Sequence, residues 1–110
     1  MTEIRYRFED DCHHLQIQGH SGFGGHGGDI VCAAVSMLGQ TLLQCLIDAE
    51  SRGDLKTLRH SRGDGALSAA ALPVPAAREP VRVMFETVLT GLEMLAGRYP
   101  ECVAYRNDSL

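Results

Sequence analysis

A histidine and a cysteine stand at the two ends of a glycine-rich segment, and together they could perform nucleophilic chemistry. His20 precedes the segment, and Cys32 follows it twelve positions later. A cysteine thiolate attacks a carbonyl carbon when a nearby imidazole accepts the thiol proton. We therefore take Cys32 as the candidate nucleophile and His20 as the candidate general base.

The residues before Cys32 predict that it lies at the start of a helix. Asp29 is a typical helix N-cap, and residues 30–49 carry an apolar stripe at three- and four-residue steps. Cys32 would then occupy the third helical position, where the helix dipole favours a thiolate and Asp29 accepts from its amide. First-turn amides would also be donors to an oxyanion. Because apolar residues follow it, a buried and inert thiol remains the competing interpretation of Cys32.

The glycines between the histidine and the cysteine predict a flexible loop that covers the substrate. Six of the twelve glycines fall between Gly19 and Gly28. Glycine tolerates the backbone angles that a close approach to a peptide needs. The predicted substrate loop contains Gly22, Gly24, Gly25, Gly27 and Gly28.

Two other interpretations of this segment fail on context. Gly22, Gly24 and Gly27 match a dinucleotide-binding pattern, but the acidic residue at the right distance, Asp48, falls inside the predicted helix rather than after a strand. A serine-hydrolase turn would need glycine where Phe23 stands. We therefore expect no nucleotide cofactor.

The remaining cysteines and histidines do not form a recognisable metal pattern. Cys12, His13 and His14 are adjacent, and His20 and His26 follow, but structural zinc sites usually show two ligand pairs at fixed spacing. We expect no metal and reduced thiols in a cytoplasmic protein. Cys45 lies deep in the predicted helix, where we expect it in the core.

Hydrophobic periodicity predicts the elements that must position His20 and Cys32. Alternating apolar residues at 4–8 and 15–17 predict a hairpin, and weaker alternation predicts two more strands near 55–60 and 66–72. A second helix is expected from Pro80 to just before Pro100, with a short edge strand after it. The order β-β-α-β-β-α predicts one α+β domain over residues 1–110, a small sheet with both helices packed on one face.

Length and composition exclude several classes of protein. The 110 residues are 45% hydrophobic and 22% charged, which is ordinary for a folded domain and not for a disordered chain. Fourteen acidic residues against ten basic ones give a net charge of -4, which argues against a nucleic-acid binder held by a general positive field. The longest apolar run is far shorter than the roughly 18 residues of a membrane span, and no leader pattern is recognisable. We expect a cytoplasmic protein without membrane or direct nucleic-acid contacts.

Two runs of residues stand out: Gly19-His20-Ser21-Gly22 and, after the loop, Asp-Ile-Val-Cys-Ala-Ala-Val-Ser at 29–36. Together they resemble the ribosomal-processing cysteine protease family, Prp. The segment 91–100 is similarly placed, so the resemblance spans nearly the whole chain. It implies a catalytic dyad of His20 and Cys32 and a homodimer. It also implies removal of the N-terminal extension of a bacterial large-subunit ribosomal protein, cut after an aromatic pair and before a small residue. Ser21 replaces the usual alanine, and the loop is unusually rich in glycine.

A non-catalytic alternative from another functional class stays open at this point. A ribosome-assembly or interaction module on the same fold would keep both helices and would need no reactive thiol. The two hypotheses differ in the reactivity that they expect of Cys32.

Overall fold

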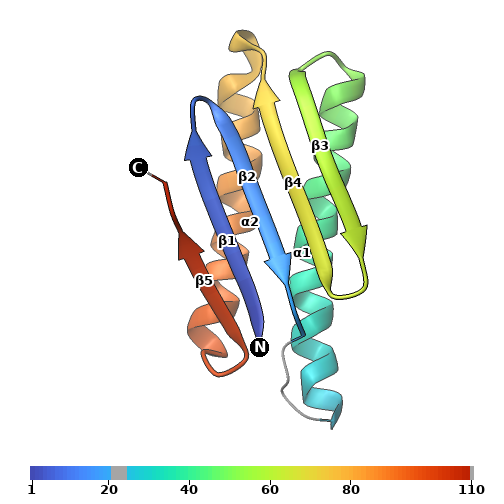
Figure 1. Ribbon diagram of the computed structural model, residues 1–110, viewed down its shortest axis with the longest axis vertical. Coiled ribbons are helices and arrows are strands. Elements are labelled where there is room, and N and C mark those ends of the chain that lie inside the picture. Colours follow the sequence, from blue (N-terminus) through green and yellow to red (C-terminus); the bar gives the residue numbers. More distant parts are fainter. Residues whose placement is uncertain (21–24, 110) are drawn as a thin grey trace.

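The computed structural model describes residues 1–20 and 25–109. Its strands and helices follow the predicted order, including the short strand expected after the second helix (Figure 1). The elements are β1 (Thr2–Glu9), β2 (Cys12–Gln18), α1 (Gly25–Ser51), β3 (Leu55–Gly63), β4 (Ala66–Pro73), the short 3-10 helix η1 (Pro75–Ala77), α2 (Arg78–Arg98) and β5 (Val103–Asn107).

The five strands form one mixed sheet, and both helices cover the same face of it (Figure 1). The strand order is β3-β4-β2-β1-β5. Neighbouring strands are antiparallel except β1 and β5, which are parallel because α2 carries the chain back along the sheet. The predicted α+β class and the placement of both helices on one face are confirmed.

The core lies between the sheet and the two helices, and mainly aliphatic side chains fill it. One stripe of each helix is buried, as is every second residue of the central strands. Largest among the fully buried side chains are Phe85 of α2, Ile4 of β1, Leu15 of β2, and Leu42 and Leu46 of α1. This packing fixes α1 over the sheet and so determines where its half-buried residues lie.

Helix α1 begins at Gly25, four residues before the predicted N-cap. Asp29 is therefore the fifth helical residue and not the cap, and Cys32 is the eighth residue and not the third. The prediction was wrong because glycine costs only about 1 kcal/mol per helical position, while each added residue extends an existing helix by one hydrogen bond. Gly25, Gly27 and Gly28 belong to α1 rather than to a loop, whereas Gly22 and Gly24 lie outside the described residues.

Much of α1 is apolar enough to resemble a membrane-spanning helix by length and composition. Residues Ile30–Ser51 form a 22-residue stretch that contains an 18-residue window with a mean hydropathy of 1.9. Core helices of globular domains have the same property, and the buried stripe of α1 packs against the sheet and α2. The helix therefore has a place in the domain core that accounts for its apolar residues.

Candidate active site

The chain turns sharply at the end of β2, and this turn places His20. Gly19 has a φ of +92°, and a β-carbon at this position would lie 2.4 Å from the carbonyl oxygen of Met1. Its amide donates to the carbonyl oxygen of Gly65 at 2.8 Å. Only glycine fits both the backbone angle and the close approach, so Gly19 holds the exposed His20 beside the β3–β4 turn.

His20 lies against the β3–β4 turn at Gly65. A β-carbon on Gly65 would lie 2.8 Å from His20 Nε2 and 3.2 Å from Cε1. Gly65 has a φ of +67°, as the second residue of a tight Asp-Gly hairpin turn requires. The hairpin thus presents a glycine surface that leaves room for the imidazole.

Cys32 lies on α1 and is half-buried beside the fully buried Val31. As the eighth helical residue it lies beyond the first turn, where the helix dipole has its main effect. Interior helical amides also donate to carbonyls four residues earlier. The predicted thiolate stabilisation by the helix end and the oxyanion donors from the first turn are therefore contradicted by the helix boundary.

A pocket of about 270 Å³ brings the candidate base and the candidate nucleophile together. His20 and Cys32 both line it, although they come from different elements. Apolar residues of β2, α1 and β4 form much of its wall, and the turn residues at 62–65 form one side. The pocket is also lined by Thr2, Ile17, Gly19, Val35, Ser36, Gly39, Ala66 and Leu67. A thiol and an imidazole that share a pocket open to solvent can perform acyl transfer on a bound carbonyl.

The other cysteines have surroundings that differ from those of Cys32. Burial raises the pKa of the Cys12 thiol, although Arg7 acts in the opposite direction. Burial also raises the pKa of Cys102, with Glu101 and Cys32 adding to the effect. Both thiols are therefore held protonated at neutral pH. Cys45 is exposed on α1, so its predicted place in the core was wrong.

Among the histidines whose side chains the structure describes, His20 alone lines the candidate site. His13 is buried, and its Nδ1 lies 2.7 Å from the hydroxyl oxygen of Tyr6. Burial lowers the pKa of His13 to about 4, so it is a neutral core residue at pH 7. Among the side chains that the structure describes, those of residues 1–20 and 30–109, no group of three or more His, Cys, Asp or Glu is arranged to hold a metal.

Sequence reasoning missed the contribution of the β3–β4 hairpin to this pocket. The Asp-Gly pair at 64–65 predicts a tight turn, but a polar turn by itself gives no reason to place Arg62, Gly63 and Asp64 in a pocket. Nothing in the local pattern shows that the turn lies beside His20, because that contact depends on how β4 pairs with β2. The signal available in the sequence was Gly65, the second residue of the Asp-Gly turn.

Comparisons with known proteins found one family model and several solved structures that are similar to this chain. The family model described as "Cysteine protease Prp" matches residues 1–104. The structure of SMU.848 from Streptococcus mutans has 29% sequence identity and a TM-score of 0.73, covering 100% of this chain and 96% of that one. An essential ribosomal processing protease Prp from S. aureus, in complex with a covalently linked product peptide, has 20% identity and a TM-score of 0.69, covering 98% and 100%. A search of the curated proteins found no match.

Proposed function

The chain belongs to the cysteine protease Prp family, and from this premise we propose that it is a cysteine endopeptidase with a His20–Cys32 dyad. Its proposed substrate is the N-terminal extension of a bacterial large-subunit ribosomal protein. The pocket that both residues line carries the proposal. The solved relatives include a Prp from S. aureus in complex with a substrate peptide, at 18% identity and a TM-score of 0.67.

The proposed reaction uses the thiol and the imidazole in two stages. In the first, His20 accepts the proton of Cys32 Sγ, and the thiolate attacks the carbonyl carbon of the scissile bond. The carbon–nitrogen bond breaks, His20 gives the proton to the departing amine, and a thioester remains on Cys32. In the second, His20 accepts a proton from water, hydroxide attacks the thioester, and the carboxylic acid and the free thiol are released.

The residues that line the pocket suit an extended peptide as substrate. Ile17, Val35 and Leu67 give the wall an apolar surface, while Ser36 and the turn at 62–65 supply polar groups. Such a mixture suits a peptide that places one apolar side chain inward and keeps its backbone hydrogen-bonded. No metal or cofactor is required by this chemistry.

Cleavage of a peptide that spans the extension junction, followed by mass spectrometry, tests the proposal. The peptide carries an aromatic pair before the junction and a small residue after it. Cys32→Ala should abolish cleavage, and His20→Ala should lower kcat by about 10²- to 10⁴-fold, as expected for a lost general base. Cys45→Ser is the matched control, because Cys45 is an exposed cysteine of the same helix outside the pocket.

Two results would overturn the proposal. A Cys32→Ala protein that still cuts the peptide would remove Cys32 from the reaction. A folded protein that cuts no junction peptide would favour the non-catalytic ribosome-assembly or interaction module instead.

We also propose that the protein forms a homodimer and acts in the cytoplasm, where ribosomes are assembled. Ile30 and Met37 are exposed two helical turns apart on α1, and Met94 is exposed on α2. Ile30 and Met37 lie on the same side of α1, where they fit a contact with a second copy of the chain, since contiguous apolar surface is typical of interfaces. Sedimentation velocity should show a dimer that Met37→Lys converts to monomers, and a monomeric unmodified protein would contradict the dimer.

A further inference from the structure

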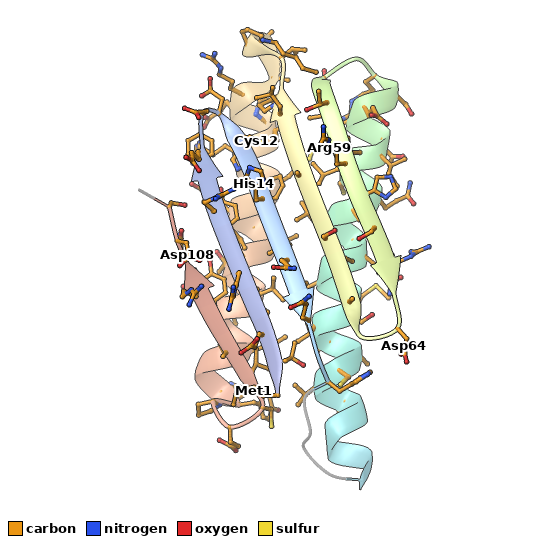
Figure 2. All side chains as sticks on the ribbon, in the orientation of Figure 1. Met1, Cys12, His14, Arg59, Asp64 and Asp108 are labelled. Carbon is orange, nitrogen blue, oxygen red and sulfur yellow. The ribbon has the colours of Figure 1, made fainter. Side chains whose placement is uncertain are left out.

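The face of the sheet turned away from the helices carries a basic groove, which we call the arginine groove. It has a volume of about 470 Å³, and Arg5, Arg7, His14 and Arg59 line it. Figure 2 labels His14 and Arg59 on this open face, with Asp108 at its side. None of these three arginines lines the pocket that contains His20 and Cys32. The groove is therefore a second surface, distinct from the candidate active site.

Strand pairing aligns the basic residues in one row across the sheet. Arg7 pairs with His14, His14 pairs with Ala70, and Ala70 pairs with Arg59. Three steps between neighbouring strands separate Arg7 from Arg59 by about 14 Å. Arg5 lies two residues before Arg7 on the same face, about 7 Å along β1. Rigid strands thus hold three guanidinium groups at fixed separations on one surface.

The positive charge of this surface is only partly compensated. Arg5 lies directly beside Arg106 in the parallel pair of β1 and β5, and like charges in such positions destabilise a sheet. Arg106 pairs with Asp108 at 2.8 Å, and Arg7 lies 3.5 Å from Glu9. Within the described part of the chain, no ion pair involves Arg5 or Arg59. Asp108 also lines the groove, but Arg5 and Arg59 are without an ion pair among the described residues, and these two guanidinium groups indicate a binding surface for an anion.

The floor of the groove favours repeated phosphates over stacked bases. Arginine presents a planar set of donors that matches a phosphate. Between the arginines lie the small residues Ala70 and Ser68, and Ser68 Oγ lies 2.7 Å from Ser61 Oγ. The strand residues Tyr6, Phe8 and Tyr105 pair in register with Leu15, His13 and Ile4, which are buried toward the helices. The described strands therefore offer hydroxyls and guanidinium groups on the open face rather than aromatic stacking platforms.

The breadth of the face distinguishes RNA from DNA. The major groove of B-form DNA admits a helix or a two-stranded ribbon, which a five-stranded sheet exceeds. The minor groove of A-form RNA is wide and shallow and presents 2′-hydroxyls with phosphates on both sides. A broad surface with arginines about 14 Å apart and hydroxyls between them fits such a groove.

We propose that the arginine groove binds A-form RNA through its phosphates and 2′-hydroxyls. This departs from the expectation of no direct nucleic-acid contact, which rested on the total charge of -4. A total charge does not describe one face, because most acidic residues, such as Asp48, Glu79 and Glu86, lie on helices or in turns. Glu3, Glu9 and Asp108 are the acidic residues on or beside the described strands of this face. The proposal stands independently of the proposed proteolysis, since the two surfaces share none of the groove arginines.

Fluorescence anisotropy with the full chain and a labelled RNA duplex of about 16 base pairs tests the proposal. The double variant Arg5→Ala with Arg59→Ala should weaken binding at least about tenfold. The logarithm of the association constant falls linearly with the logarithm of the salt concentration. The double variant should reduce the steepness of this line by about 2, one unit for each lost phosphate contact. The matched control is Arg52→Ala with Arg98→Ala, which removes the same charge from exposed residues outside the groove and should leave binding nearly unchanged.

Several outcomes would overturn the RNA assignment. These are the absence of duplex binding, an equal loss in both double variants, and equal affinity for a DNA duplex of the same sequence or for polyglutamate. Cleavage of the junction peptide by the groove variant is measured in parallel and should be unchanged. A failure of RNA binding with intact cleavage would remove only the groove proposal, and the reverse result would remove only the proteolysis proposal.

Discussion

The imidazole of His20 lies against the backbone of Gly65, so close that a β-carbon on this glycine would be 2.8 Å from Nε2. The two residues lie far apart in the sequence, and a hydrogen bond from the amide of Gly19 to the carbonyl oxygen of Gly65 joins their segments. The position of the candidate base thus depends on the shape of a hairpin turn rather than on its own strand alone.

The first prediction concerns this contact. Gly65→Ala should push the imidazole out of place and lower kcat for the junction peptide by about 10- to 100-fold, because a displacement of roughly 1 Å has an effect of this size. The positive φ also makes the substitution cost about 1–2 kcal/mol of stability. Kinetics and urea unfolding on the same variant measure the two effects.

Two further glycines provide the controls for Gly65→Ala. Gly53 has a φ of +84° and nothing within 4 Å of a β-carbon, so Gly53→Ala carries the strain without the contact. Gly63 lies in the same turn region with open space around it. If Gly53→Ala lowers kcat as much as Gly65→Ala does, the loss reflects stability and His20 is not positioned by Gly65.

The second prediction compares the two accessible thiols of α1. Cys45 is exposed and Cys32 is half-buried, so accessibility alone predicts faster alkylation of Cys45. If an imidazole accepts the thiol proton, the thiolate fraction rises and Cys32 should react roughly tenfold faster at pH 7. Peptide mapping after brief exposure to iodoacetamide measures both rates. The advantage of Cys32 should disappear in His20→Ala, and an advantage that persists there would have another origin.

The third prediction concerns the pH dependence of stability. Burial lowers the pKa of His13 to about 4, below the ordinary value of 6.5 that applies when the chain is unfolded. Between these values the unfolded state binds more protons, so stability is full above about pH 6.5 and falls as the pH drops toward 4. The total loss from this group is about 3 kcal/mol. Urea unfolding at pH 7 and pH 5 measures the slope.

His13→Phe should flatten this slope, while His60→Gln should leave it unchanged because His60 is exposed. The phenyl ring keeps the contact with Phe85, whose ring centroid lies 4.5 Å from that of His13. The Tyr6 hydroxyl loses its partner, which lowers stability by about 1–3 kcal/mol at every pH. An unchanged slope in His13→Phe would assign the acid sensitivity to other groups.

The fourth prediction separates two helical glycines. A β-carbon on Gly39 of α1 would lie 3.0 Å from Ile17 Cδ1 and 3.3 Å from Leu67 Cδ1, whereas one on Gly97 of α2 would meet nothing within 4 Å. Gly97→Ala should therefore stabilise the protein by about 0.5–1 kcal/mol. Gly39→Ala should lose this gain to overpacking and destabilise by about 1 kcal/mol. Thermal and urea unfolding compare them, and equal stabilisation would contradict close packing at Gly39.

Much of the fold could be predicted because each element carries its own local pattern. Alternation around Ile4 and Ile17 predicts the first hairpin, and three- and four-residue spacing of buried residues such as Val35 and Leu42 predicts α1. The β-β-α-β-β-α order predicted that both helices pack on one face of the sheet. The start of α1 was predicted wrongly. The preference of Asp29 for a helix N-cap is too weak to stop the helix from extending through the glycines before it.

The sequence by itself determined which groups could do chemistry, since His20 and Cys32 flank a distinctive run of residues typical of one family. Only the tertiary structure decided that both line one pocket and that Gly65 lies against the imidazole. The same holds for Arg7 and Arg59, which strand pairing brings into one row on a chain that is acidic in total. These relationships join residues distant along the chain, and their geometry arises from strand pairing and packing rather than from local sequence.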